Sequence, residues 1–97
     1  MIALDFDAVA NRFLGEPGVT EGQMFGMPVL KVGGKVFVGL WEGRLLVKLP
    51  AERVSALIAS GEGAAFAPRE GRVSKEWLLV GADEELAAEA LRFVAAR

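Results

Sequence analysis

The sequence contains no cysteine, no histidine and no tyrosine among its 97 residues. Without cysteine there is no disulfide, no thiolate nucleophile and no Cys-based metal site. Without histidine the chain lacks the most common general base and the most common transition-metal ligand. Catalysis would rest on Asp, Glu, Lys, Ser or Thr, and no Ser or Thr has an evident activating neighbour. We therefore expect a protein that is not an enzyme and that uses no cofactor or metal.

Long apolar runs and a strong excess of one charge are also missing. No run reaches the roughly 18 apolar residues of a membrane helix. The opening MIALDFDAVANRF is acidic where an export signal is positively charged, so we expect a cytoplasmic protein. The net charge of −2 argues against nucleic-acid binding by the whole surface. Residues 31–75 are nevertheless mildly basic between two acidic ends, which indicates either solvated strand and loop faces or a weak basic patch.

What the chain has is core material, since 53% of its residues are hydrophobic. Its length fits one domain spanning residues 1–97. Three segments have the apolar spacing of amphipathic helices: 5–14, 50–60 and 83–97. Asp5 and Asp83 are the expected N-caps of the first and last, Pro50 is expected at the first position of the second, and Gly61 is expected to end it. The residues expected on the buried helix faces are Phe6, Val9, Ala10, Phe13, Val54, Leu57, Ile58, Leu86, Ala90, Phe93 and Val94.

Between the first two helices the period changes to that of strands. Residues 24–32, 35–41 and 44–49 predict a three-stranded antiparallel meander, with tight turns at Gly33-Gly34 and Glu42-Gly43. Pro28 predicts an edge, a bulge or a break in the first strand, and GEPGVTEG before it is expected to be a loop. The second strand is expected to be covered on both faces, with alternating sets of apolar residues. These sets are Val36, Val38 and Leu40 on one face and Phe37 and Trp41 on the other.

Two further strands are expected after the second helix, a short one at 65–67 ended by Pro68 and a longer one at 74–80. The predicted fold is therefore α+β, in the order α-β(3)-α-β(2)-α, with an antiparallel sheet packed with helices. In the strand at 44–49, alternation places Leu46 and Lys48 on one face and Leu45 and Val47 on the other. In the strand at 74–80, it places Trp77 and Leu79 on one face and Leu78 and Val80 on the other.

Three motifs that suggest chemistry have simpler explanations. VGGK lacks the spacing and the Ser or Thr of a phosphate-binding loop, and Lys35 leads into a strand, so a hairpin is favoured. GEGAAF follows a helix and lacks the third glycine of a dinucleotide fingerprint. Asp83, Glu84 and Glu85 are explained by their place at a helix start.

Aromatic and basic residues offer the remaining signal. Trp41 and Trp77 stand at strand ends, where they pack on the core or face a partner. Arg69, Arg72 and Lys75 lie beside Trp77, and basic residues flanking an aromatic ring can contact phosphates while the ring stacks on a base. Solvated side chains are the alternative.

Two stretches carry a family resemblance. MFGMPVLKVGGKVFVGLWEGRLLVKLP, residues 24–50, resembles the signature of TfoX/Sxy N-terminal domains, with a Met-Phe-Gly start, a Gly-Lys hairpin, a strand Phe and a final Leu-x-x-Lys. VSKEWLLVGADEELAAEALRFV resembles the closing strand and helix of that family and of the MmcQ/YjbR-like proteins, in which a Lys and a Trp, here Lys75 and Trp77, open the last strand. The signature residues are Met24, Phe25, Gly26, Gly34, Lys35, Phe37, Leu45 and Lys48.

The resemblance implies the same α-β(3)-α-β(2)-α fold and no catalytic residues. Full-length TfoX-like regulators of competence carry a second helical domain that residues 1–97 do not contain, so the resemblance implies the fold more than that role. We expect a non-enzymatic domain that acts, in regulation, through protein or nucleic-acid contacts. The alternatives are a homodimerisation module near residues 24–28 and a small-molecule binder or minor enzyme. The expected contact surface is Lys31, Lys35, Lys48, Arg69, Arg72, Lys75 and Trp77.

Overall fold

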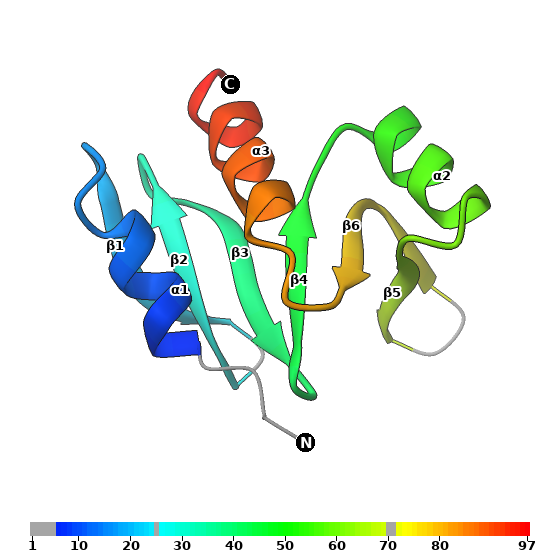
Figure 1. Ribbon diagram of the computed structural model, residues 1–97, viewed down its shortest axis with the longest axis horizontal. Helices are drawn as coiled ribbons and strands as arrows, with labels where there is room; N and C mark the ends of the chain where they lie inside the picture. Colours follow the sequence, from blue (N-terminus) through cyan, green and yellow to red (C-terminus); the bar gives the residue numbers. More distant parts are fainter. Residues whose placement is uncertain (1–5, 25, 70–71) are drawn as a thin grey trace.

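A computed structural model describes residues 6–24, 26–69 and 72–97, and the side chains of residues 67–74 lie outside this description. The expected cap Asp5 and the signature residue Phe25 also lie outside it. The described residues form one six-stranded antiparallel sheet, in the order β1-β2-β3-β4-β6-β5, and three helices (Figure 1). This confirms the α+β class and the order of helices and strands. The elements are α1 (Phe6–Phe13), β1 (Val19–Met24), β2 (Met27–Val32), β3 (Lys35–Trp41), β4 (Arg44–Lys48), α2 (Ala51–Ala59), β5 (Ala64–Arg69), β6 (Arg72–Val80) and α3 (Glu84–Ala95).

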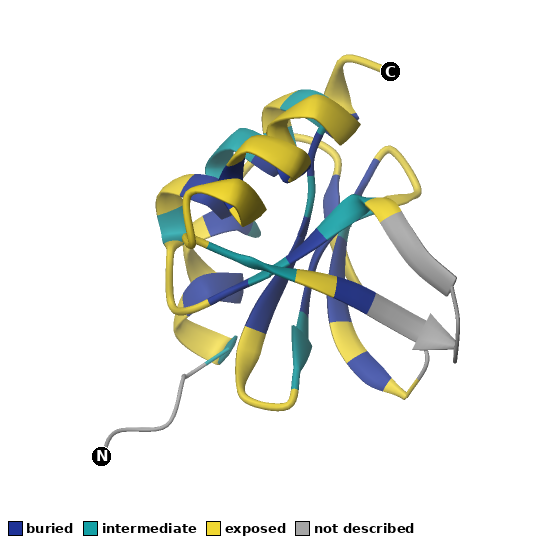
Figure 2. Cartoon of the chain, turned by 90° about the vertical axis from the view of Figure 1, so that its right-hand side faces the viewer, coloured by how far each residue is buried: buried dark blue, intermediate teal, exposed yellow. Residues whose placement is uncertain are grey.

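All three helices lie on the same face of the sheet, so the molecule has two layers (Figure 2). α3 packs on β3 and β4, and α2 packs on β6. The main core lies between the layers and takes residues from every helix and from β1, β2, β3, β4 and β6. A T-shaped pair of Phe13 and Phe37, with ring centroids 5.9 Å apart, joins α1 to β3. β3 is central in the sheet, but among the described residues the helices cover one of its two faces, not both as expected.

The outer strand β1 corrects another expectation: residues 15–22 were expected to be a loop, but residues 19–24 form a strand. They pair with β2 along their whole length, from Val19 opposite Val32 to Met24 opposite Met27. Only Val19 of the strand is buried, which explains why its sequence carries no strand pattern. Pro28 is tolerated because the β2–β3 ladder begins one residue later, at Val29. The meander thus has four strands instead of three.

A β-bulge in β3 changes which side chains share a face. Lys31 pairs with Val36, but the preceding residue of β2, Leu30, pairs with Val38, so Phe37 is an extra residue in the ladder. Phe37 and Val38 both join the main core, while Val36 packs with Trp41 on the other face. The expected grouping of Val36 with Val38, and of Phe37 with Trp41, is therefore wrong.

Turn and cap chemistry follows the sequence closely. The two central residues of both hairpin turns have positive φ, at 59° and 82° for Gly33-Gly34 and at 50° and 76° for Glu42-Gly43. Asp83 caps α3, since its Oδ1 accepts from the Leu86 N–H at 3.1 Å. Pro50 lies one position earlier than expected, at the N-cap of α2. β5 continues through Pro68 to its end, which an edge strand permits.

Candidate functional site

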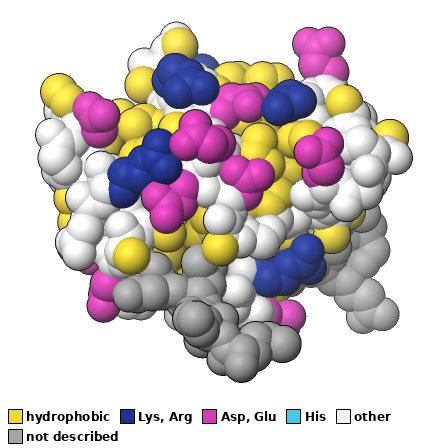
Figure 3. All heavy atoms as spheres, in the orientation of Figure 1, with side chains coloured by type: hydrophobic (Ala, Val, Ile, Leu, Met, Phe, Trp, Pro, Cys, Tyr) yellow, Lys and Arg dark blue, Asp and Glu magenta, His cyan; other side chains and the backbone are white. Residues whose placement is uncertain are grey.

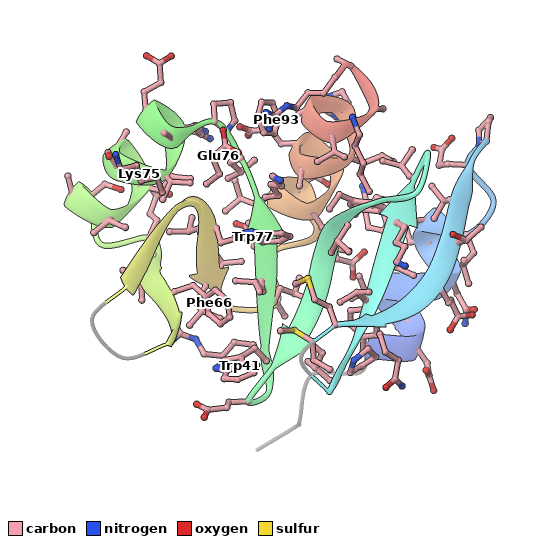
Figure 4. All side chains as sticks on the ribbon, turned by 180° about the vertical axis from the view of Figure 1, so that it is seen from behind. Trp41, Phe66, Lys75, Glu76, Trp77 and Phe93 are labelled. Atoms are coloured by element: carbon pink, nitrogen blue, oxygen red, sulfur yellow. The ribbon has the colours of Figure 1, made fainter. Side chains whose placement is uncertain are left out.

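The face of the sheet opposite the helices carries a second apolar cluster (Figure 4). Its buried members are Met27, Val29, Leu46 and Phe66, and within the described residues no helix side chain belongs to it. Antiparallel sheets often leave one face toward solvent, but that face is then usually polar. We call this surface the open face. The partly buried residues around its floor are Met24, Val36, Trp41, Trp77 and Leu79.

The floor of the open face is closely packed. The rings of Trp41 and Phe66 form a T-shaped pair at 5.3 Å and 80°, which ties β3 to the edge strand β5. Gly39 lies in the middle of β3, where a side chain would collide with Met27 and Val29, each 3.0 Å from the place of a Cβ atom. Because this space is already filled, the open face has a continuous floor.

Three basic residues lie on the open face, as the alternation of side chains along the described strands shows. Lys31 alternates with Val29, and Arg44 and Lys48 alternate with Leu46, which places all three on this face. The Lys31 side chain lies across β1, where a methyl group at Gly22 would be 2.8 Å from its Cε. Lys48 Nζ lies 5.5 Å from the centroid of the Trp77 ring, a cation–π arrangement.

The acidic strand residues point the other way. Glu21 alternates with Val19, and Glu76 precedes Leu78, and both Val19 and Leu78 belong to the core under the helices. On the helix face, acidic and basic side chains are mixed (Figure 3). Arg12 there donates to Glu84 at 3.0 Å. The charged strand positions of the open face are therefore basic, while the helix face carries both signs, a difference that the net charge of −2 conceals.

The ion pairs of the helix face change the acidity of their arginines. The carboxylates of Glu84 and then Glu85 hydrogen-bond to Arg12 and raise the pKa of its guanidinium. Arg53 donates to Glu89 at 2.9 and 3.2 Å, and this hydrogen bonding raises the pKa of Arg53. Glu84 and Glu85 at the start of α3, where the helix dipole favours carboxylates, therefore hold Arg12 of α1, and Glu89 further along α3 holds Arg53 of α2.

The structure separates the residues of the expected contact surface. Lys31, Lys48 and Trp77 share the open face, where Lys48 lies over the Trp77 ring. Lys35 lies opposite Val32, on the helix side of the sheet, and lines a hollow with Arg97 instead. Lys75 is exposed and lies beyond the last β4–β6 pair, Lys48 with Trp77. The side chains of Arg69 and Arg72 lie outside the described residues.

Three charged residues of this region were missed from the sequence. Arg44 follows a turn, and only its alternation with Leu46 would have placed it on the open face. Glu76 Oε1 accepts from Arg97 at 3.1 Å and lies 4.0 Å from Lys48 Nζ, at the rim where β4 ends and α3 ends. These contacts join parts of the chain that are distant in the sequence, so no local sequence pattern predicts them.

The geometry defines a class of protein before any comparison: a small two-layer α+β domain with one sheet face left uncovered. Within the described residues, none of the helices is both long and apolar enough to cross a membrane. A family model described as YjbR matches residues 14–93, and the chain therefore belongs to the YjbR family. This confirms the MmcQ/YjbR part of the resemblance, while the TfoX part stays a prediction. No curated protein and no solved structure matches the chain.

Proposed function

We propose that the chain is a non-enzymatic nucleic-acid-binding domain that holds single-stranded nucleic acid on its open face. The observation that carries the proposal is the charge of that face. Among its described strand positions, the charged residues are Lys31, Arg44 and Lys48, and they surround a floor that includes two tryptophans. Cations that follow a backbone, together with aromatic rings on which bases stack, are the two elements of single-strand binding.

The geometry favours a single strand over a duplex. A duplex hides the faces of its bases, so it would use the cations but leave the apolar floor uncovered. An unpaired base can stack on the partly exposed rings of Trp41 or Trp77, and stacking contributes about 1–3 kcal/mol per base. The apolar surface of the open face is then covered by the same ligand that neutralises its cations.

Homodimerisation through the open face is the alternative that its apolar floor favours. A two-fold dimer places the same patch of both copies in contact. It would therefore bring two sets of Lys31, Arg44 and Lys48 together, and like charges placed against each other are destabilising. A polyanion meets the same patch with opposite charge, which is why we place nucleic acid first. Static light scattering across a concentration series tests the alternative, since a stable dimer would raise the measured mass.

Salt dependence of binding is the direct test. We expect a fluorescently labelled single-stranded oligonucleotide to bind with an affinity that falls as salt rises, with a log–log slope of about −2 for three contacts. Lys31→Gln should reduce the magnitude of that slope by about 0.7, because one phosphate contact is lost. A labelled duplex of the same sequence should bind more weakly than the single strand.

Arg92→Gln is the matched control, because Arg92 is exposed on α3 and the substitution changes the net charge by the same amount. It should leave the slope unchanged. Quenching of tryptophan fluorescence reports stacking, and Trp41→Phe and Trp77→Phe identify the ring involved. Equal effects of the two charge substitutions, or the absence of salt-sensitive binding at micromolar protein, would contradict the proposal.

The finer expectations from the sequence belong to this proposal as well. A regulatory role, a likeness to TfoX N-terminal domains and a location in the cytoplasm are all consistent with a small binding domain of this kind. The signature in residues 24–50 supports the likeness to TfoX N-terminal domains. Expression of a fluorescent fusion in the source cells would test the location independently of binding.

A further inference from the structure

A hollow lies at the end of the sheet where α3 ends, away from the floor of the open face. It has a volume of about 360 Å³ and lies between the turn before β1, the β2–β3 hairpin and the last residues of α3. A smaller hollow of about 180 Å³ adjoins it and shares Lys35, Val94 and Arg97 with it. The combined space is of the size that small ligands occupy. The larger hollow is lined by Pro17, Gly18, Val32, Gly33, Lys35, Val94, Ala95 and Arg97.

Cations dominate the polar lining of these hollows. Lys35, Lys48 and Arg97 line the smaller one. Glu76 is the carboxylate that the described contacts bring to them, at 3.1 Å from Arg97 and 4.0 Å from Lys48. No side-chain carboxylate pairs with Lys35 among the described contacts, and its Nζ donates to the main-chain oxygen of Arg97 at a long 3.5 Å. An ammonium group has three donors, so Lys35 retains donors for a ligand.

Two of the cations are held in place before any ligand arrives. The Arg97 guanidinium lies 5.1 Å from the centroid of the Phe93 ring, and Lys48 lies over Trp77. Glu76 lies between these two cations at the rim. A series of side-chain contacts therefore runs from the helix layer to the sheet (Figure 4), in the order Phe93, Arg97, Glu76, Lys48 and Trp77. Side chains that are already positioned lose less conformational entropy on binding, which favours affinity.

We propose that this hollow binds a small anion, through the phosphate or carboxylate group of a small molecule. The Lys35 ammonium and the Arg97 guanidinium hold the anionic group, and the apolar side chains of Val32 and Val94 contact the rest of the ligand. The proposal does not rest on nucleic-acid binding, because Lys35 lies on the helix side of the sheet and not on the open face. Lys48 lines the smaller hollow and also borders the open face, so Lys35 is the residue that separates the two sites.

An amide-resonance titration by NMR tests the proposal at constant ionic strength. Inorganic phosphate is the first probe and succinate the second, so the two arms distinguish the phosphate from the carboxylate source. We expect saturable shifts at Gly18, Gly33, Lys35 and Arg97 with at least one probe. Lys35→Gln should weaken that binding by about tenfold, because a charge-assisted hydrogen bond is lost.

Lys31→Gln is the matched control on the open face and should leave the affinity for the probe unchanged. If both lysine variants weaken binding equally, the anion is attracted by general charge and the proposal is wrong. Linear shifts that never saturate with either probe would also overturn it. Neither result bears on oligonucleotide binding by Lys31, so the failure of this proposal and of the proposed function are distinguishable.

Discussion

Gly39 offers the sharpest test of how the open face is built. A Cβ atom at this position would lie 3.0 Å from Met27 Sδ, 3.0 Å from Val29 Cγ1 and 3.4 Å from the Pro28 carbonyl oxygen. Its backbone does not require glycine, because its φ is not among the positive values of the chain. Gly39→Ala therefore isolates a packing effect. Met27 and Val29 are 4% and 1% exposed, so neither can move into solvent to make room.

The expected cost has two opposing parts. Overpacking a filled core typically costs about 1–3 kcal/mol. Replacing glycine by alanine also restricts the unfolded chain, which returns about 0.4–1 kcal/mol. We expect Gly39→Ala to lower the free energy of unfolding by about 1–2 kcal/mol. In a domain of this size that lowers Tm by roughly 5–15 °C.

A double-mutant cycle with Val29→Ala tests the cause. Valine is stiff about χ1 and is fixed on β2, so it cannot turn away from an added methyl group as the end of a methionine can. Once Val29 is truncated, the methyl group of Gly39→Ala occupies freed space. We expect the double variant to be more stable than the sum of the single effects predicts, by about 1 kcal/mol. Urea denaturation followed by tryptophan fluorescence measures each corner of the cycle.

Gly43→Ala is the matched control, since no atom lies within 4 Å of the added Cβ but φ is 76°. It should cost about 1–2 kcal/mol through backbone strain alone, and its effect should add to that of Val29→Ala. Additive behaviour of Gly39→Ala with Val29→Ala, within about 0.5 kcal/mol, would refute the packing argument. A Gly39→Ala variant as stable as the parent would refute it too.

Three further predictions concern the N-cap of α3, the position of Lys31 and the carboxylate beside Lys48. Asp83→Ala should lower the free energy of unfolding by about 1 kcal/mol through loss of the N-cap of α3, whereas Asp83→Asn should cost little; urea denaturation measures both. Gly22→Ala should displace the flexible end of Lys31, 2.8 Å away, and weaken oligonucleotide binding as Lys31→Gln does, with little change in Tm. Glu76→Gln should release Lys48 from a nearby carboxylate, which tightens oligonucleotide binding and steepens its salt dependence; weaker binding would contradict this.

Much of the fold follows from local chemistry. Gly33-Gly34 and Glu42-Gly43 set the hairpins, and Asp83 sets the start of α3. Alternation in β4 separates Leu46 and Lys48 from Leu45 and Val47 as predicted. β1 could not be predicted, because its residues are mostly exposed and its pairing with β2 is what makes it a strand. The bulge at Phe37 is equally hidden, since it follows from the match between two strands and not from either sequence alone.

The candidate site was predictable only in part for the same reason. Lys31 alternates regularly with Val29 in β2, and Lys48 alternates regularly with Leu46 in β4. Once the order of the strands was known, these residues could be assigned to the same face of the sheet. Lys35 lies on the far side of the bulge from Gly39 and Trp41, and it turns to the helix layer. Contacts such as Arg97 with Glu76 join residues 21 positions apart, and only the tertiary fold brings them together.

Segregation of charge between the layers explains how an acidic protein can present a binding face for a polyanion. The start of α3 favours carboxylates because of the helix dipole, and Arg12 and Arg53 pair with the carboxylates of that helix. Acidic residues are thus retained in the helix layer, while Lys31 and Arg44 on the open face have no carboxylate partner among the described contacts. A polyanion that approaches the helix layer meets carboxylates mixed with cations, whereas one that approaches the open face meets Lys31 and Arg44 without paired carboxylates. The distribution of charge over the surface therefore directs a polyanion toward the open face, although the net charge of the protein is −2.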